Sequence, residues 1–236
     1  MAMCCALALT GCKSKSLTSS QQSVFTLYTQ GMESMKKAQW DEAADQFEEL
    51  ERQHPFSAWA AKSQLMAAYA AYCNQDFSRA LTNVNGFLVL HPVHDYADYA
   101  QYLKGLCYFH DLQGIRNDST KTMQALETFQ VLVRQFPHSR YFWDAKTKIS
   151  TLRELLAARK MAVARELASL NIWPGAIQGF RDIITEYPQT RYVPESFYRL
   201  IEIFHILRVS DEVENLTRLM RKRFPKNLWL KKALQL

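Results

Sequence analysis

A frame of residues repeated around five prolines is the feature that most constrains the fold. A small apolar residue stands twelve positions before each proline, and an aromatic residue stands four positions after it. Eight positions before the proline the residue is large and apolar in four of the five copies. Residues four apart share one helix face, and proline ends a helix because it lacks the N–H and clashes with the preceding turn. The frame therefore predicts a helix that ends at each proline. Its members are Ala43, Phe47, Pro55 and Trp59; Ala80, Val84, Pro92 and Tyr96; Ala125, Phe129, Pro137 and Tyr141; Ala176, Phe180, Pro188 and Tyr192; and Val213, Thr217, Pro225 and Trp229.

This spacing resembles the second helix of a tetratricopeptide repeat. Gly31 stands where the first-helix glycine of that family falls, and later copies place Ala68, Ala164 and Ile201 there. A small residue lets two helices approach closely, and the aromatic ring fills the gap beside it. Each hairpin needs neighbours to cover its open face. We therefore predict an all-α fold, a right-handed superhelical solenoid of five tetratricopeptide-like helical hairpins.

The spacing between the prolines locates two longer segments. The prolines lie 37, 45, 51 and 37 residues apart, whereas the family period is about 34. Residues 113–119 are rich in Gly, Asn, Asp and Ser, which predicts an enlarged loop. Residues 141–170 contain neither proline nor glycine, which predicts one long central helix of about 45 Å. We expect this helix to link an N-terminal half, residues 24–140, to a C-terminal half, residues 141–236.

The N-terminus contains a short motif, Leu9-Thr10-Gly11-Cys12, that resembles a bacterial lipobox. In that family the cysteine is acylated and the peptide before it is removed. The resemblance implies that residues 1–11 are a leader, that Cys12 is the lipidation site, and that the polar, Ser-rich residues 12–23 are a flexible tether. No Lys or Arg precedes Cys12, so we expect the complete leader to begin upstream of Met1. The alternative is a chance match in a hydrophobic N-terminus.

A tethered lipoprotein built from five such hairpins resembles the BamD family, lipoproteins of the bacterial outer-membrane barrel-assembly machine. The resemblance covers nearly the whole chain. Residues 53–56, 136–141 and 187–190, together with Trp173, carry it best. Lys13 is compatible with outer-membrane sorting, because lipoproteins kept in the inner membrane typically have aspartate there. The loop at residues 115–119 has a single aspartate where the family is more acidic.

The resemblance implies a non-catalytic scaffold that is lipid-anchored at the periplasmic face of the cell outer membrane. Its N-terminal hairpins would receive unfolded outer-membrane protein precursors. Its C-terminal hairpins would hold the periplasmic domains of the barrel-forming assembly subunit, with other assembly lipoproteins alongside. Two alternatives stay open: a different periplasmic repeat lipoprotein that scaffolds cell-envelope or division proteins, and a cytosolic repeat adaptor if the lipobox is accidental.

Aromatic residues of neighbouring first helices are the candidates for peptide binding. In a solenoid of this kind such residues line the concave surface. Tyrosine offers an apolar body with a polar tip, which suits an extended peptide with an aromatic end. The alternative is that these rings pack between hairpins. The candidates are Trp59, Tyr69, Tyr72, Tyr99 and Tyr102.

The C-terminal segment, residues 215–236, is the candidate for partner binding. It holds seven Lys and Arg residues and no acidic residue, so the positive charge of this segment is larger than the net charge of the whole chain, +6. Such clustering suits an acidic partner surface, anionic headgroups or nucleic acid, and an exported lipoprotein meets no nucleic acid. The alternative is a solvated face without a partner. The candidate residues are Arg218, Arg221, Lys222 and Arg223.

The sequence predicts no enzyme, no cofactor and no metal site. His91, His94 and Asp95 form the best metal-ligand group, but Pro92 predicts a polar turn at that position instead. The sequence holds none of the common nucleotide-binding, hydrolase or metalloprotease motifs. Cys73 and Cys107 lie late in successive first helices. They could pair in an oxidising compartment or stay as buried thiols.

Overall fold

The computed structural model describes residues 22–111 and 119–236, and these ranges contain eleven α-helices and no β-strand. Cys12, the expected leader, most of the expected tether and nearly all of the expected loop at residues 113–119 lie outside the described residues. The helices are α1 (Val24–Lys36), α2 (Trp40–Gln53), α3 (Ala60–Cys73), α4 (Phe77–Leu90), α5 (Ala97–Asp111), α6 (Ser119–Gln135), α7 (Phe142–Ser169), α8 (Trp173–Glu186), α9 (Val193–Ile206), α10 (Ser210–Arg223) and α11 (Leu228–Ala233).

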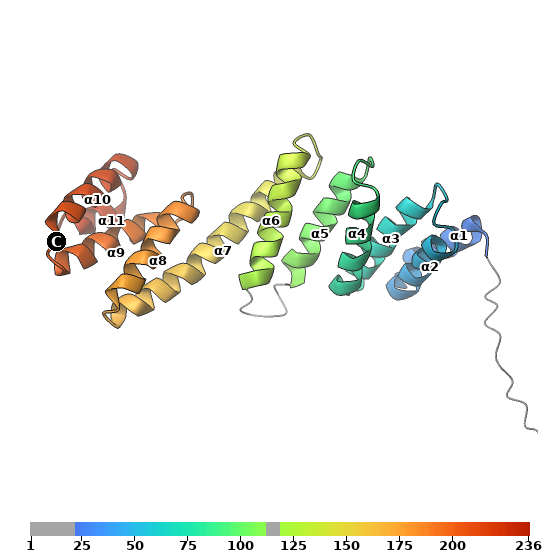
Figure 1. The fold of residues 1–236 in the computed structure, drawn as a ribbon, viewed down its shortest axis with the longest axis horizontal. Helices are drawn as coiled ribbons and strands as arrows, with labels where there is room; N and C mark the ends of the chain where they lie inside the picture. Colours follow the sequence, from blue (N-terminus) through green and yellow to red (C-terminus); the bar gives the residue numbers. More distant parts are fainter. Residues whose placement is uncertain (1–21, 112–118) are drawn as a thin grey trace, which may run out of the picture.

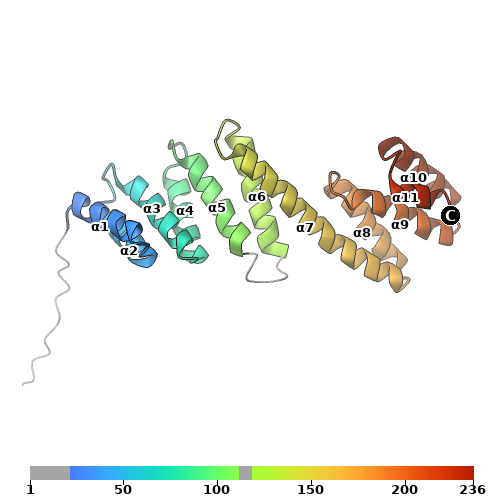
Figure 2. The same ribbon diagram turned by 180° about the vertical axis from the view of Figure 1, so that it is seen from behind.

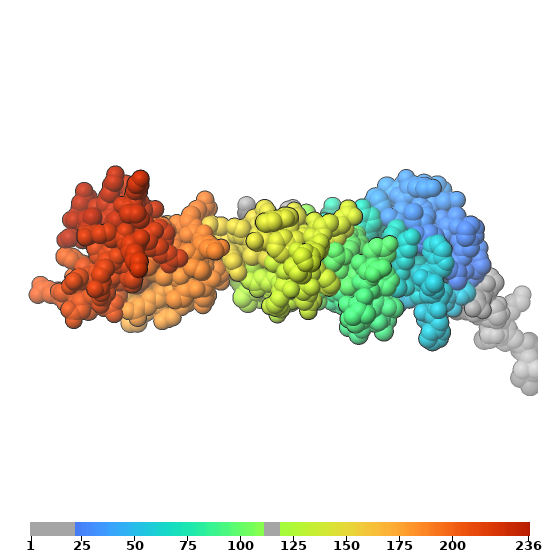
Figure 3. Space-filling view, turned by 90° about the horizontal axis from the view of Figure 1, so that it is seen from above, coloured from blue at the N-terminus to red at the C-terminus, as the bar shows by residue number. Residues whose placement is uncertain are grey.

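The helices pair into five hairpins that stack in chain order. Each helix from α1 to α10 packs against the next one, and α11 folds back against α9. Figure 1 shows the resulting row, and Figure 2 shows the same order from behind. Seen from above, the row is one continuous elongated body (Figure 3). The prediction of an all-α, tetratricopeptide-like solenoid with five hairpins is confirmed.

All five prolines lie in the same local structure. The residue before each proline ends a second helix or directly follows it, and its carbonyl oxygen accepts a hydrogen bond from the N–H three residues on. This bond closes a tight turn that starts the next hairpin. The five pairs are His54 and Ser57, His91 and His94, Phe136 and Ser139, Tyr187 and Thr190, and Phe224 and Asn227.

Inside the hairpins, the small residue and the large apolar residue of the repeated frame are fully buried in the first four copies. The ring of Phe47 lies directly over Gly31, where an added Cβ would come within 2.8 Å of Cε1. The ring of Phe129 lies over Gly105 in the same way, with a Cβ-to-Cε1 distance of 2.5 Å. The two helices of these hairpins can therefore approach closely only because the first helix carries glycine there.

Gly105 has the same place in the third hairpin as Gly31 has in the first. Its position cannot be found by counting back from the proline. Gly31 lies 24 residues before Pro55, whereas Gly105 lies 32 residues before Pro137. The eight additional residues fall between the glycine and the second helix, around the segment that separates α5 from α6. Counting back from the proline therefore points to the wrong residue in this hairpin.

Helix α7 joins the two halves of the solenoid. It has 28 residues, begins after Tyr141 and ends before Leu170, so the predicted long central helix is confirmed. Ala145, Ile149 and Leu152 of its first half belong to a core shared with α6. Met161 and Ala164 of its second half belong to a core shared with α8 and α9. One rigid helix thus carries both cores.

An ion-pair network centred on Arg79 joins the first two hairpins. The guanidinium of Arg79, on α4, donates to three carboxylates of α2: Asp41 at 2.9 Å, Asp45 at 2.5 Å and Glu48 at 2.8 Å. Asn83 donates to the same Glu48 carboxylate at 2.7 Å. The hydrogen bond from Arg79 holds the pKa of Glu48 below its ordinary value of 4.5. The network therefore stabilises the junction while Glu48 is ionised.

We expect Gly105→Ala to destabilise the protein by about 1–3 kcal/mol, because overpacking a close-packed core costs that much. The free energy of unfolding in denaturant measures the effect. Gly175→Ala is the matched control, since its Cβ would come no closer than 3.0 Å to another side chain, at Cδ1 of Leu167. Equal stability of the two variants would contradict the close-approach argument.

We expect Arg79→Ala to lower the free energy of unfolding by about 1–2 kcal/mol at pH 7, because it leaves three neighbouring carboxylates unpaired. The folded pKa of Glu48 is depressed, so this stabilisation is present above about pH 4.5 and is lost as the pH falls through the folded value. The difference between wild type and variant should shrink accordingly. Arg52→Ala, which removes an exposed pair within α2, is the control. A difference that stays constant down to pH 3 would contradict the assignment.

Candidate functional site

Four of the five aromatic candidates for peptide binding come together on α3 and α5. Tyr69 and Tyr72 of α3 and Tyr99 of α5 are partly buried and pack against one core cluster. Tyr102 lies one turn further along α5 and packs against the next cluster. Their rings therefore contribute to packing between hairpins, and they form one tyrosine-rich surface across the second and third hairpins.

Tyr141 completes this surface, and the sequence analysis did not assign it to peptide binding. Its ring stacks on Tyr102 with centroids 4.4 Å apart, and it lies 5.7 Å from Tyr99. The Tyr102 hydroxyl donates to the Asp144 carboxylate at 2.6 Å. Tyr141 already stood in the repeated frame as the residue four positions after Pro137, so its spacing offered a signal. We call Tyr69, Tyr72, Tyr99, Tyr102 and Tyr141 the tyrosine surface.

The pKa values of four phenol groups of this surface, those of Tyr69, Tyr72, Tyr99 and Tyr102, are raised, so these groups are neutral at physiological pH. Burial raises the pKa of Tyr99 and of Tyr102 above the ordinary value of 10. A hydrogen bond with Cys73 raises the pKa of Tyr69, and burial raises that of Tyr72. Neutral hydroxyls can both donate and accept hydrogen bonds. The surface can therefore bind a peptide backbone without attracting charge.

Trp59, the fifth candidate, lies apart from the tyrosine surface. It precedes α3, is 43% exposed, and lies against Tyr28 of α1 with ring centroids 4.6 Å apart. The ammonium group of Lys62 lies over both rings, at 5.3 Å from Tyr28 and 5.6 Å from Trp59. Trp59 therefore belongs to a separate aromatic group at the start of the solenoid.

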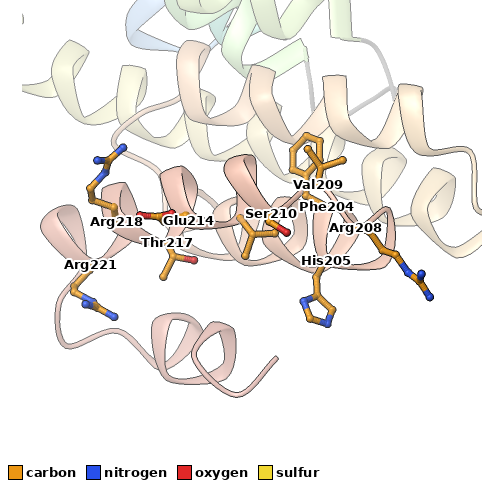
Figure 4. Close-up of a pocket in the computed structure, with 10 residues that line it drawn as sticks. Phe204, His205, Arg208, Val209, Ser210, Glu214, Thr217, Arg218 and Arg221 are labelled. Carbon is orange, nitrogen blue, oxygen red and sulfur yellow. The ribbon is translucent and has the colours of Figure 1, made fainter.

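A groove at the C-terminal end contains two of the predicted partner-binding residues. Its volume is about 960 Å³, and it runs along α10 to the end of α9. Figure 4 shows Arg218 and Arg221 at one end of this groove, and Arg208 and His205 at the other. All four side chains are exposed. We call this feature the arginine groove.

The remaining two predicted partner-binding residues lie elsewhere. Lys222 is exposed but does not line the arginine groove. The guanidinium of Arg223 donates to the carbonyl oxygen of Pro188 at 2.6 Å and lies over the ring of Phe224. Arg223 therefore connects α10 to the turn between α8 and α9.

The arginine groove coincides with the one break in the repeated frame. In the fifth hairpin Thr217 replaces the large apolar residue, and both Thr217 and Val213 line the groove. Arg208, which the sequence analysis missed, holds its exposed position through a left-handed backbone with φ of 59°. In the sequence, the groove is indicated by Thr217 at a position where a large apolar side chain is expected. The charge of the C-terminal segment indicates its location less well.

The predicted polar turn at His91 and His94 consists of packed rings. Both imidazoles lie against Phe87, with centroids 5.3 and 5.4 Å away. Nδ1 of His94 accepts a hydrogen bond from the backbone N–H of Tyr96 at 3.2 Å. Within residues 22–111 and 119–236, no group of three His, Cys, Asp or Glu side chains is placed to hold a metal ion.

The two cysteines differ in their surroundings. Cys107 is buried and packs with Ala71 and Ala80, whereas Cys73 is a partly exposed free thiol. Burial raises the pKa of Cys73, so its thiol is protonated at neutral pH. None of the helices in the described ranges combines the length and apolar character needed to cross a bilayer.

A row of tetratricopeptide-like hairpins that carries a tyrosine surface and, further along the row, an arginine groove defines a helical-repeat protein. The YfiO family, described as outer membrane lipoprotein, matches residues 20–219. The chain therefore belongs to this lipoprotein family, the BamD family of outer membrane protein assembly factors.

Individual relatives span nearly the whole chain. The outer membrane protein assembly factor BamD of Caulobacter vibrioides is 32% identical over 235 residues, covering 98% of this chain and 77% of that protein. BamD of Rickettsia prowazekii is 29% identical over 231 residues, covering 98% and 92%. A solved tetratricopeptide-repeat protein of Thermus thermophilus is 15% identical with a TM-score of 0.43, covering 91% of this chain and 100% of that one.

Proposed function

We propose that this protein is a non-catalytic scaffold lipoprotein of the outer-membrane barrel-assembly machinery. A lipid on Cys12 would hold it at the periplasmic face of the outer membrane. Membership of the BamD family supports a role in this machinery, and the lipobox supports a lipid anchor on Cys12. The observation that carries the proposal is that α3 and α5, which carry most of the tyrosine surface, lie apart from α9 and α10, which carry the arginine groove, in one row of helices (Figure 1). One scaffold could then hold a client and a partner at the same time.

The tyrosine surface and the Trp59 group would receive unfolded outer-membrane protein precursors. Rings with neutral hydroxyls offer apolar contact and hydrogen bonds to an extended chain at low entropic cost, because few side-chain torsions become fixed. The exposed edge of Trp59 lies within reach of the cation on Lys62. A precursor end that carries an aromatic side chain and a carboxylate would match both groups.

The arginine groove would hold the periplasmic domains of the barrel-forming assembly subunit. Three arginines stand at its two ends, and Val209 and Val213 contribute apolar surface between them. A partner segment with an apolar centre and acidic ends would bury apolar area and pair its carboxylates with guanidinium groups. The exposed cations Lys222, Lys226 and Lys231 lie outside the groove, where they could contact other assembly lipoproteins.

We expect the double variant Tyr69→Phe with Tyr72→Phe to weaken precursor binding by about 5-fold or more, because each of the two lost neutral hydrogen bonds contributes about 0.5–1.5 kcal/mol. The rings remain, so the melting temperature should change little. Photo-crosslinking to a peptide with a C-terminal aromatic residue measures binding. Tyr108→Phe, on the same α5 helix as Tyr99 but in a different cluster, is the control. Unchanged crosslinking in the double variant would show that these two hydroxyls do not contribute to peptide binding.

We expect the double variant Arg218→Glu with Arg221→Glu to reduce copurification of the barrel-forming subunit by about tenfold or more at low salt. Lys226→Glu with Lys231→Glu makes the same change in net charge within the same segment, outside the groove, and should retain the subunit. Circular dichroism checks that both variants fold. Equal losses in both variants would show that net charge, and not the groove, determines the interaction.

A further inference from the structure

A second groove lies beside the first half of α7 and is separate from both surfaces described above. It has a volume of about 290 Å³ and lies between α6, α7 and the turn that joins α8 to α9. Val133 of α6 and the buried Ile149 of α7 give it apolar walls, and Arg134, Lys146 and Arg153 bring three cations to it. It exists because α7 is long enough for α6 and α8 to pack on different parts of it (Figures 1 and 2).

The three cations of this groove form no ion pair with any residue in the described ranges. Cations at two other junctions between helices are neutralised. Arg79 pairs with three carboxylates of α2, and Lys160 pairs with Asp182 and Glu186 of α8. The groove therefore differs from these two junctions, where carboxylates of a neighbouring helix balance the positive charge.

Glu154, the acidic residue among those that line the groove, contacts Arg191 with both carboxylate oxygens, and its buried Oε2 has no hydrogen-bond partner. Its Oε1 accepts the backbone N–H of Arg191 at 3.0 Å, and its Oε2 lies 3.6 Å from Nε of the same arginine. This contact fixes the turn between α8 and α9, whose Gln189 and Thr190 form one wall. Glu154 thus shapes the groove and leaves its positive charge in excess.

Exposed aromatic surface adjoins the groove. The ammonium group of Lys146 lies 5.1 Å from the ring centroid of Trp143 and 5.4 Å from that of Phe142. Trp143 is 73% exposed, which adds a large apolar side chain to the surface beside the rim. A ligand in the groove could therefore continue over an apolar flank.

We propose that this groove binds an acidic segment of a protein partner. An aliphatic side chain would pack against Val133 and Ile149, and neighbouring carboxylates would pair with Arg134, Lys146 and Arg153. A cavity of about 290 Å³ takes one or two side chains, and its combination of apolar walls with a cationic rim matches alternating aliphatic and acidic residues. A bound carboxylate would offset the positive charge that these three cations bring to the groove.

The test uses the full-length protein in detergent and a fluorescein-labelled hexapeptide of alternating Leu and Glu. Fluorescence anisotropy measures its binding, with a Leu and Gln hexapeptide as the uncharged comparison. Lys146→Glu with Arg153→Glu reverses two rim charges, and Ser150→Trp fills the groove without changing its charge. Lys36→Glu with Lys37→Glu, at exposed positions at the end of α1 and outside both grooves, is the control for an equal change in net charge.

We expect the acidic peptide to bind, and both groove variants to weaken that binding by about tenfold or more, with the control variant unchanged. Higher ionic strength should weaken it further. Equal binding of the uncharged peptide, or unchanged affinity in both groove variants, would overturn the proposal. So would groove-dependent binding to phosphatidylglycerol vesicles without peptide binding, which would assign the site to a lipid headgroup. None of these outcomes depends on whether the chain serves in barrel assembly.

Discussion

The close approach of a glycine and an aromatic ring inside the first and third hairpins is the contact on which the packing of the N-terminal half depends. Phe47 over Gly31 and Phe129 over Gly105 set the distance between paired helices. The tight proline turns then fix the entry to the next hairpin. Because every hairpin buries its open face on a neighbour, a change in this contact alters the stacking of all that follows.

Two departures from this pattern create the binding features. The length of α7 separates α6 from α8, which leaves a cationic groove beside it. The substitution of Thr217 for a large apolar residue accompanies the arginine groove on α9 and α10. In a repeat protein, positions that break the frame are therefore informative about function, since the frame itself only maintains packing.

The proline frame was sufficient to predict the hairpins and the extent of α7, since helix ends and buried faces follow from local spacing. Gly105 escaped because an inserted segment shifted its distance from Pro137. Arg208 and the cations at Arg134 and Arg153 escaped for another reason. They join their sites through packing between helices that are distant in the sequence, which periodicity does not encode. Charge alone grouped Arg218 with Arg223, whereas the fold separates them.

We propose that this chain is a lipid-anchored scaffold for barrel assembly. The most direct measurement is affinity purification of the tagged, full-length protein from detergent-solubilised membranes, with mass spectrometry of its partners and of its N-terminal peptide. The account predicts an acylated Cys12 and a barrel-forming membrane protein in stoichiometric amount. An unmodified Cys12 together with only soluble partners would contradict it, and would leave a helical-repeat adaptor with a different client.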